Sequence, residues 1–509
     1  MKNRGSIILK NGIIGFGSQI ITALFAFVTR SLFLHHIGAE LLGINSVFAS
    51  ALAALSLTEL GFQTAIVYML YEPLNKGDKE RINAIVCILK RLYETVGVVF
   101  MALSFAILPF LRFILKGVDL TVEIYVFFLL QSLASTCTYF MAYRRSLLYA
   151  DQKDYVSKFI DVIVNTLFNI ILCIAIIVLK SYWAYLIIKV VQVVVANLII
   201  SVYCKKNYDY LHRVPIDKTI LKDILGKTKN VFIGRFAGFI YSSTDNLVIS
   251  SFISASVVAF YGNYLTVLVN IRSVLDSAMN SMVSIVGNYM VENSENSEKK
   301  KFFLLYSHIR YYIALIVVVP LVVLLEYFIE MWVGKEYILP TVITYLMGAD
   351  LYIHLVHAPA YEFVTASGLF KEEKNIEIAG AISNITLSVI GVKLIGIPGV
   401  LLGTVVSQSV FWIGRSWLAY KTCLQLPTKE YVKYWMREAY YLAAAIAMLF
   451  ICKGAFGIIN IENMIMKFIV TGVVCEVIIV IIAFVVLNIF EENKKVLHIF
   501  SDFIKRKMH

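Results

Sequence analysis

Charged residues are scarce in this chain: they make up 16% of its 509 residues, whereas soluble domains carry about 25%. The seven cysteines form no Cys-x-x-Cys pair, so neither a zinc site nor a disulfide framework is indicated. The sequence also lacks a nucleophile elbow, a P-loop and a dinucleotide fingerprint. We therefore predict that the protein is not an enzyme and hydrolyses no ATP.

Long apolar runs fill most of the sequence, and hydrophobic residues make up 59% of it. Runs of about twenty apolar residues are typical of transmembrane helices. We predict an all-α polytopic membrane protein with about fourteen such helices. The spans lie near residues 11–34, 41–70, 92–111, 120–142, 156–179, 181–203, 229–252, 256–280, 308–329, 338–364, 375–395, 397–420, 439–459 and 466–489.

The predicted spans form two groups of six, with two more near the C-terminus. Seven basic residues lie in the connection from Lys205 to Lys229, which separates the groups. We expect two pseudo-symmetric six-helix lobes plus two C-terminal helices. The predicted parts are an N-lobe over 1–204, a basic cytoplasmic linker over 205–228, a C-lobe over 229–421, helices within 434–490 and a cytoplasmic tail over 491–509.

The distribution of basic residues predicts the orientation of the chain. Of the 46 Lys and Arg residues, 34 fall in the N-terminus, the even-numbered connections and the C-terminal tail, and only seven fall in the other connections. Cytoplasmic loops are enriched in Lys and Arg. We therefore expect both termini in the cytoplasm, and no nucleic-acid partner, because topology explains the net charge of +12.

An internal similarity relates the two groups of spans. A shift of about 215 residues lays Thr-Arg-Ser-Leu-Phe at 29–33 over Thr-Asp-Asn-Leu-Val at 244–248. In both places a long span ends, a short turn follows and another long span begins. Because a shift by six helices preserves orientation, we expect a parallel repeat with its axis along the membrane normal.

These motifs resemble the polysaccharide flippases, the Wzx-like O-antigen and capsule transporters, of the multidrug/oligosaccharidyl-lipid/polysaccharide exporter superfamily. The resemblance rests on Asn-Gly at 11–12, Thr-Arg at 29–30, Gly-Ala-Glu-Leu-Leu-Gly at 38–43, Ser-Thr-Asp-Asn-Leu-Val-Ile-Ser at 243–250 and Ala-Phe-Tyr at 259–261. It implies two six-helix lobes around a central cavity, alternating access, and a polyprenyl-pyrophosphate-linked oligosaccharide as cargo. It also implies surface polysaccharide synthesis at the bacterial cytoplasmic membrane and cationic cavity residues that bind the pyrophosphate.

Three arginines lie toward the predicted cytoplasmic ends of their spans: Arg235, Arg272 and Arg415. A charged residue at the centre of a bilayer costs roughly 2.5–3.5 kcal/mol, so each needs an explanation. The planar guanidinium binds phosphate oxygens bidentately, and we predict a pyrophosphate clamp. The alternative is snorkelling to the inner headgroups, which applies most to Arg415.

Two further cations lie in the outer parts of their spans. Lys189 is predicted to receive the phosphate later in the transport cycle, with snorkelling as the alternative. Arg30 is included among the cargo-binding candidates. It is also repeat-equivalent to Asp245, so these two residues could form a gate, or simply lie at the membrane interface.

Acidic residues inside spans are candidates for ion coupling or gating. Glu59 lies midway along its span, where a short acidic side chain snorkels poorly. Asp276 follows Arg272 by four residues, so the two could pair on one helix face. Asp350 and His354 share a helix face, where a polar cavity stripe is a better prediction than a metal site. We expect no cofactor apart from a coupling cation, Na+ or H+.

Two other functions are alternatives to this interpretation. A cation-coupled multidrug antiporter of the same superfamily should favour acidic residues in its lumen, and the acids here roughly balance the intramembrane cations. A membrane glycosyltransferase or polymerase needs larger extramembrane loops than this chain offers. The expected partners are the lipid-linked oligosaccharide, membrane lipids and polysaccharide polymerase or assembly proteins, with the protein itself a monomer.

Overall fold

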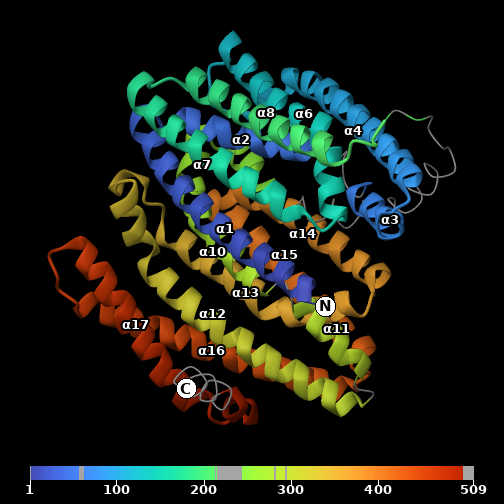
Figure 1. Cartoon of the computed structure of the whole chain (residues 1–509). Helices are drawn as coiled ribbons and strands as arrows, with labels where there is room; N and C mark the ends of the chain where they lie inside the picture. Colours follow the sequence, from blue (N-terminus) through green and yellow to red (C-terminus); the bar gives the residue numbers. More distant parts are fainter. Residues whose placement is uncertain are drawn as a thin grey trace. The chain divides into compact units, whose positions relative to one another are not determined.

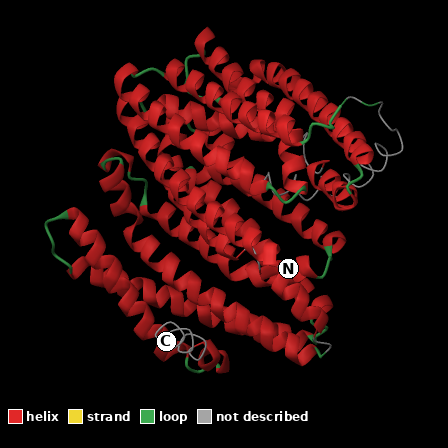
Figure 2. Ribbon diagram, in the orientation of Figure 1, coloured by secondary structure: helices red, strands yellow, loops and turns green. Residues whose placement is uncertain are grey.

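The computed structural model describes residues 2–56, 62–212, 214, 244–279, 282–292 and 295–496. Within these residues the regular structure is helical, and no strand occurs (Figure 2). Ten of the described helices are long and apolar enough to cross a membrane. A helix satisfies its own backbone hydrogen bonds, as a lipid environment requires. The predicted fold class is confirmed, whereas the number of fourteen stays approximate because span 229–252 lies mostly outside the described residues.

Contacts divide the chain into two compact units, Met1–Val274 and Leu275–His509. The predicted lobes, which divide at the basic linker, stay a prediction. The helices that begin in the first unit are α1 (Lys2–His36), α2 (Ala39–Leu55), α3 (Phe62–Lys76), α4 (Lys79–Ile107), α5 (Leu111–Ile114), α6 (Val122–Ala150), α7 (Asp154–Leu179), α8 (Tyr182–Asn207) and α10 (Ala255–Met279) (Figure 1). Those of the second are α11 (Met282–Glu292), α12 (Asn296–Trp332), α13 (Thr341–Ala366), α14 (Phe370–Ile395), α15 (Ile397–Leu418), α16 (Thr428–Ile458) and α17 (Met464–Leu487).

Several helices begin well before the apolar windows that predict them. The windows near 92, 308 and 439 belong to helices that start at Lys79, Asn296 and Thr428. In the first turns of α4 the charged side chains are exposed while Ile82, Ile85 and Leu89 are buried. An apolar window therefore indicates the part of a helix that would lie in the hydrocarbon core of the membrane. The helix itself extends beyond this window, and the extension is amphipathic.

In the first unit α6 packs against both α4 and α8, and α1 packs against α7. Aromatic contacts link these helices, for example Phe48 with Phe128 at a centroid separation of 5.1 Å. At the start of α2, a Cβ on Gly43 would collide with the backbone of Ala255 at the start of α10. These two helix starts are the segments that the internal repeat relates, and they lie in direct contact.

In the second unit α12 packs against α13, α16 and α17, and these helices lie side by side in Figure 1. Helices α14 and α15 form a tight hairpin. Its turn residue Gly396 has a φ of +70°, which favours glycine. A Cβ on Gly399 would collide with the backbone of Gly391, so small residues allow the two backbones to approach closely.

Candidate functional site

Arg30 of α1 reaches across to α10. Its Nε donates to Oδ1 of Asn263 at 2.6 Å, and its Nη2 donates to the carbonyl of Ala259 at 2.8 Å. The guanidinium lies over Gly262, where a Cβ would collide with Nη2. These two acceptors are neutral oxygens, and the lack of a side chain on Gly262 makes room for the guanidinium.

Lys189 of α8 is held in the same way, by amides. Its Nζ donates to Oδ1 of Asn169 at 3.3 Å and to Oε1 of Gln192 at 3.2 Å. Gln192 in turn donates to Asn165 of α7 at 2.8 Å. This ladder of amides orients the ammonium without neutralising its charge.

The lack of a carboxylate partner distinguishes these two cations from a third in the same unit. Arg145 of α6 forms a bidentate pair with Asp161 of α7, at 2.6 and 2.9 Å. Among the described residues, neither Arg30 nor Lys189 has a salt bridge. Their positive charges are therefore available to an anion.

Arg30 and Lys189 lie at similar depth. Arg30 is six residues from the end of α1, and Lys189 is seven from the start of α8, which places each about 10 Å from the predicted outer ends. Tyr185 lies one helical turn from Lys189 and packs against Phe33 of α1, with ring centroids 5.0 Å apart. The two cations thus belong to one layer where α1 and α8 meet.

Lys189 lines a pocket of about 250 Å³ between α2, α6 and α8. A separate pocket of about 400 Å³ in the same unit does not include Lys189. The other polar residues that line the Lys189 pocket include Asn45, Gln131 and Tyr185. Oε1 of Gln131 is buried and has no hydrogen-bond partner among the described residues. An ammonium beside an unpaired amide acceptor suits a ligand that carries both anionic oxygens and hydroxyl groups.

Arg415 of α15, in contrast, is only 9% exposed and lies among carboxylates. Its Nε donates to Oε1 of Glu373 at 2.8 Å, and its Nη2 lies 3.6 Å from Oε1 of Glu377. His357 of α13 lies 3.3 Å from Nη1. The Nδ1 of this histidine contacts the carbonyl of Ile353, so the proton belongs on Nδ1 and Nε2 accepts from Arg415. The cluster joins α13, α14 and α15, and its acids compensate the arginine charge.

Asp276 and His354 lie beside this cluster. Nε2 of His354 is 3.1 Å from Oδ1 of Asp276, at the end of α10 that belongs to the second unit. The rings of His354 and His357 are 6.0 Å apart. A row of titratable groups therefore runs from Asp276 to Arg415, which is an arrangement that can hold a proton. Its role in ion coupling stays a prediction.

Two other predicted acids each accept a hydrogen bond from a neutral group. Asp350 accepts a hydrogen bond from Gln408 at 3.4 Å, and Asp245 accepts one from Tyr261 at 3.1 Å. Arg272 and Asp276 both lie on α10. Arg235 and Glu59 lie outside the described residues. In the described ranges of the chain, no group of three or more His, Cys, Asp or Glu is placed to hold a metal ion.

The buried ion pair between Arg310 and Glu362 was not predicted from the sequence. Arg310 of α12 donates to Glu362 of α13 at 2.5 Å and to the hydroxyl of Tyr306 at 2.8 Å. Arg310 lies at the start of the predicted span 308–329, directly after a basic connection, so the sequence pattern assigns it to that connection. Glu362 is the residue that could have indicated this pair. It is an acid within an apolar span and has no Lys or Arg near it in sequence, so a cation from another helix is expected beside it.

An apolar pocket of about 470 Å³ lies in the second unit, between α12, α13, α15 and α16. Valines of α12 and leucines of α16 line it, with Tyr352 and Trp412 as the larger members. Its chemistry suits hydrocarbon and excludes an anionic headgroup. Among the described residues, the two cations without a carboxylate partner that were predicted to bind cargo, Arg30 and Lys189, lie in the first unit.

Comparison with known proteins gives both a family and a fold. The family model described as polysaccharide biosynthesis protein matches residues 8–286, which is more than half of the chain. No curated protein matches the sequence significantly.

Among solved structures, the fold is similar to that of the lipid II flippase MurJ in an inward closed conformation. The TM-score is 0.68 at 15% identity, and the match covers 93% of this chain and 98% of that one. It is also similar to an inward-facing multidrug resistance MATE family transporter of the MOP superfamily. That TM-score is 0.61 at 16% identity, with 80% of this chain and 97% of the other covered. The two likenesses confirm the predicted fold.

Proposed function

This chain belongs to the polysaccharide biosynthesis protein family, and on this premise we propose that it is a flippase for polyprenyl-pyrophosphate-linked oligosaccharides. The cargo would cross the bacterial cytoplasmic membrane from the inner to the outer face by alternating access. The protein would act as a transporter, not an enzyme, in O-antigen or capsule synthesis.

The observation that carries the proposal is that neither Arg30 nor Lys189 has a carboxylate partner among the described residues. Holding two cations within a membrane span is unfavourable by a few kcal/mol each unless something offsets it. Their amide and carbonyl partners orient them but supply no negative charge. A pyrophosphate supplies that charge. At 4 Å and an effective dielectric constant of 20, one pair of unit charges contributes about 4 kcal/mol.

The remaining parts of the cargo match the other features of the first-unit pocket. Sugar hydroxyls both donate and accept hydrogen bonds, as do the amides of Asn45 and Gln131 beside Lys189. The outer depth of Lys189 suits a site that holds the headgroup late in the cycle. The polyprenyl chain would remain in lipid or against an apolar surface of the protein.

The membrane potential can drive this transport. Moving an anion outward across a membrane that is negative inside is favourable by about 2.3 kcal/mol per charge per 100 mV. A coupling cation is therefore not required, although the row from Asp276 to Arg415 could serve one. We propose a monomer with both termini in the cytoplasm, working beside polymerase and assembly proteins.

The test is complementation in the source strain with its own copy of the gene deleted. Lys189→Gln should abolish or strongly reduce surface polysaccharide, and Lys189→Arg should retain part of it. Lys180→Asn is the matched control: it removes an exposed lysine in the turn between α7 and α8, and asparagine tolerates the left-handed conformation found there. Protein abundance in the membrane is measured for each variant.

Two results would count against the proposal. Full complementation by Lys189→Gln would reject the anion site. A deletion strain with normal polysaccharide but increased drug susceptibility would favour the alternative, a cation-coupled multidrug antiporter with the same fold.

A further inference from the structure

A second basic pocket lies at the other end of the first unit, far along the helices from Lys189. It is a cavity of about 400 Å³ where α4 begins and where α6 and α8 end. By the Lys and Arg distribution this is the cytoplasmic end. The cavity lining includes Asn83, Cys87, Lys90, Tyr143, Arg144 and His212.

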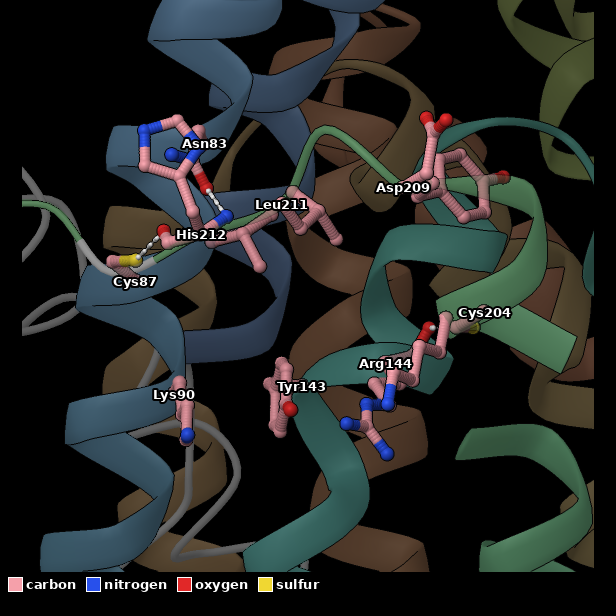
Figure 3. Close-up of a pocket in the computed structure, with 12 residues that line it drawn as sticks. Asn83, Cys87, Lys90, Tyr143, Arg144, Cys204, Asp209, Leu211 and His212 are labelled. Carbon is pink, nitrogen blue, oxygen red and sulfur yellow. Dashed lines mark hydrogen bonds between the residues drawn. The ribbon is translucent and has the colours of Figure 1, made fainter. Parts of the chain in front are cut away.

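Two cations lie on either side of one aromatic ring in this pocket. Lys90 and Arg144 flank Tyr143 (Figure 3), with Nζ of Lys90 5.9 Å and the guanidinium carbon of Arg144 5.2 Å from the ring centroid. Lys90 has a partner in Glu94, but the separation is 3.8 Å and both side chains are about one-third exposed. Arg144 has no salt bridge among the described residues. The ring holds the two cations apart without neutralising either.

A buried donor is the second observation that points to a ligand. Asn83 is 1% exposed. Its Oδ1 accepts from the backbone N–H of His212 at 3.0 Å, but its Nδ2 has no hydrogen-bond partner among the described residues. Leaving a buried amide donor unpaired costs about 1–3 kcal/mol, and native proteins rarely keep one without a reason.

The pocket has a fixed rim. The segment after α8 is held against α4 by the bond from His212 to Asn83 and by Cys87, whose Sγ donates to the carbonyl of His212 at 3.2 Å (Figure 3). Tyr208 closes another side and donates to Asp151 at 2.6 Å. Three helix ends are thereby joined around a preformed polar cavity.

We propose that this pocket binds a phosphate group, carried either by an anionic phospholipid headgroup of the inner leaflet or by a soluble phosphate ester. Arg144 and Lys90 supply the charge, and Nδ2 of Asn83 supplies a directed donor. The site is separate from the cargo site at Lys189 and does not depend on the proposed transport function. A simple attraction of surface lysines to headgroups would explain the cations, but not the unpaired donor of Asn83.

The first measurement identifies the ligand source. The purified full-length protein is placed in bilayer nanodiscs of phosphatidylcholine with or without phosphatidylglycerol, and bound lipid is counted by native mass spectrometry after release. A parallel arm adds inorganic phosphate or glycerol 3-phosphate at constant ionic strength in phosphatidylcholine alone, and follows the thermal unfolding midpoint. Retained phosphatidylglycerol assigns the site to lipid. A phosphate-dependent rise in the midpoint assigns it to a soluble ester.

Variants show whether the ligand occupies this pocket. Arg144→Gln and Lys90→Gln together should weaken binding about tenfold or more, because charge-assisted hydrogen bonds are lost. Asn83→Asp keeps the acceptor for His212 and turns the donor into a negative charge, so it should also abolish binding. The matched control is Lys158→Gln, which removes a lysine of α7 that pairs with Asp154 at 2.8 Å and does not line the pocket.

The proposal is overturned by either of two results. One is that neither phosphatidylglycerol nor soluble phosphate binds. The other is that Lys158→Gln weakens binding as much as the double variant Arg144→Gln/Lys90→Gln does, which would mean that general surface charge is responsible. Asn83→Asp preserves volume and the contact to His212, so it keeps the test meaningful where the double variant fails to fold.

Discussion

Arg415 offers a quantitative test of how the second unit is held together. Its guanidinium bonds Glu373 at 2.8 Å, and the side chains of the two residues are only 10% and 6% exposed. Breaking a buried pair by removing one partner costs about 3–5 kcal/mol, because the remaining charge stays buried. Glu377 lies farther away, at 3.6 Å, and is 23% exposed, so we expect its contribution to be below about 1 kcal/mol.

We therefore expect Arg415→Met to destabilise the protein by about 3 kcal/mol or more. The double variant Arg415→Met/Glu373→Met removes both charges and should recover much of that loss, giving a coupling of about 1–3 kcal/mol. The assay is the unfolding of the purified protein in detergent for the wild type, both single variants and the double variant. Surface polysaccharide is measured in parallel.

Two outcomes would refute this reasoning. If Arg415→Met changes stability by less than about 0.5 kcal/mol, the ion pair is not a structural element. If the double variant is stable yet makes no polysaccharide, Arg415 binds cargo directly, as the sequence alone predicts. Recovery of both stability and polysaccharide in the double variant would assign Arg415 a structural role.

Three further predictions concern single positions. Gly262→Ala should displace the Arg30 guanidinium and reduce surface polysaccharide without changing any charge; normal polysaccharide would show that the position of Arg30 is unimportant. Gly399→Ala should cost about 1–3 kcal/mol by overpacking the α14–α15 hairpin, measured as a lower unfolding midpoint. Burial and the hydrogen bond to Asp151 raise the pKa of Tyr208. The hydroxyl of Tyr208 therefore stays protonated to a higher pH in the folded protein than in the unfolded chain. The stability it contributes is full below about pH 10 and declines as the pH rises further. Tyr208→Phe should cost about 1 kcal/mol at neutral pH and remove this alkaline decline; an unchanged decline would contradict the assignment.

Apolar runs alone predict most of the fold, because a bilayer-spanning segment must be both helical and apolar. Windows of apolar residues do not predict where helices end. In α4, the segment from Lys79 to Arg91 is helical, with charged residues on one face and Ile82 and Leu89 buried on the other. The close approach of α2 to α10 was not predicted: the repeat relates the two segments in sequence, and the contact itself depends on the missing side chain of Gly43.

The intramembrane charges show what sequence reasoning cannot supply. Lys189 and Arg415 are both basic residues in apolar helices, and their sequence surroundings do not distinguish them. Within the described part of the chain, Arg415 pairs with two glutamates of α14, whereas Lys189 donates to two amides. Such partners come from the rotation and packing of neighbouring helices, which a single helix pattern does not fix.

The most direct test of the account is equilibrium binding of a polyprenyl pyrophosphate to the purified protein in nanodiscs, with a neutral polyprenol as control. The wild type should bind the pyrophosphate and not the alcohol. Arg30→Gln/Lys189→Gln should bind it about 100-fold more weakly, as expected when close charge pairs worth about 3 kcal/mol are lost. Equal affinity of wild type and double variant, or equal binding of pyrophosphate and alcohol, would contradict the claim that these two cations form the anion site.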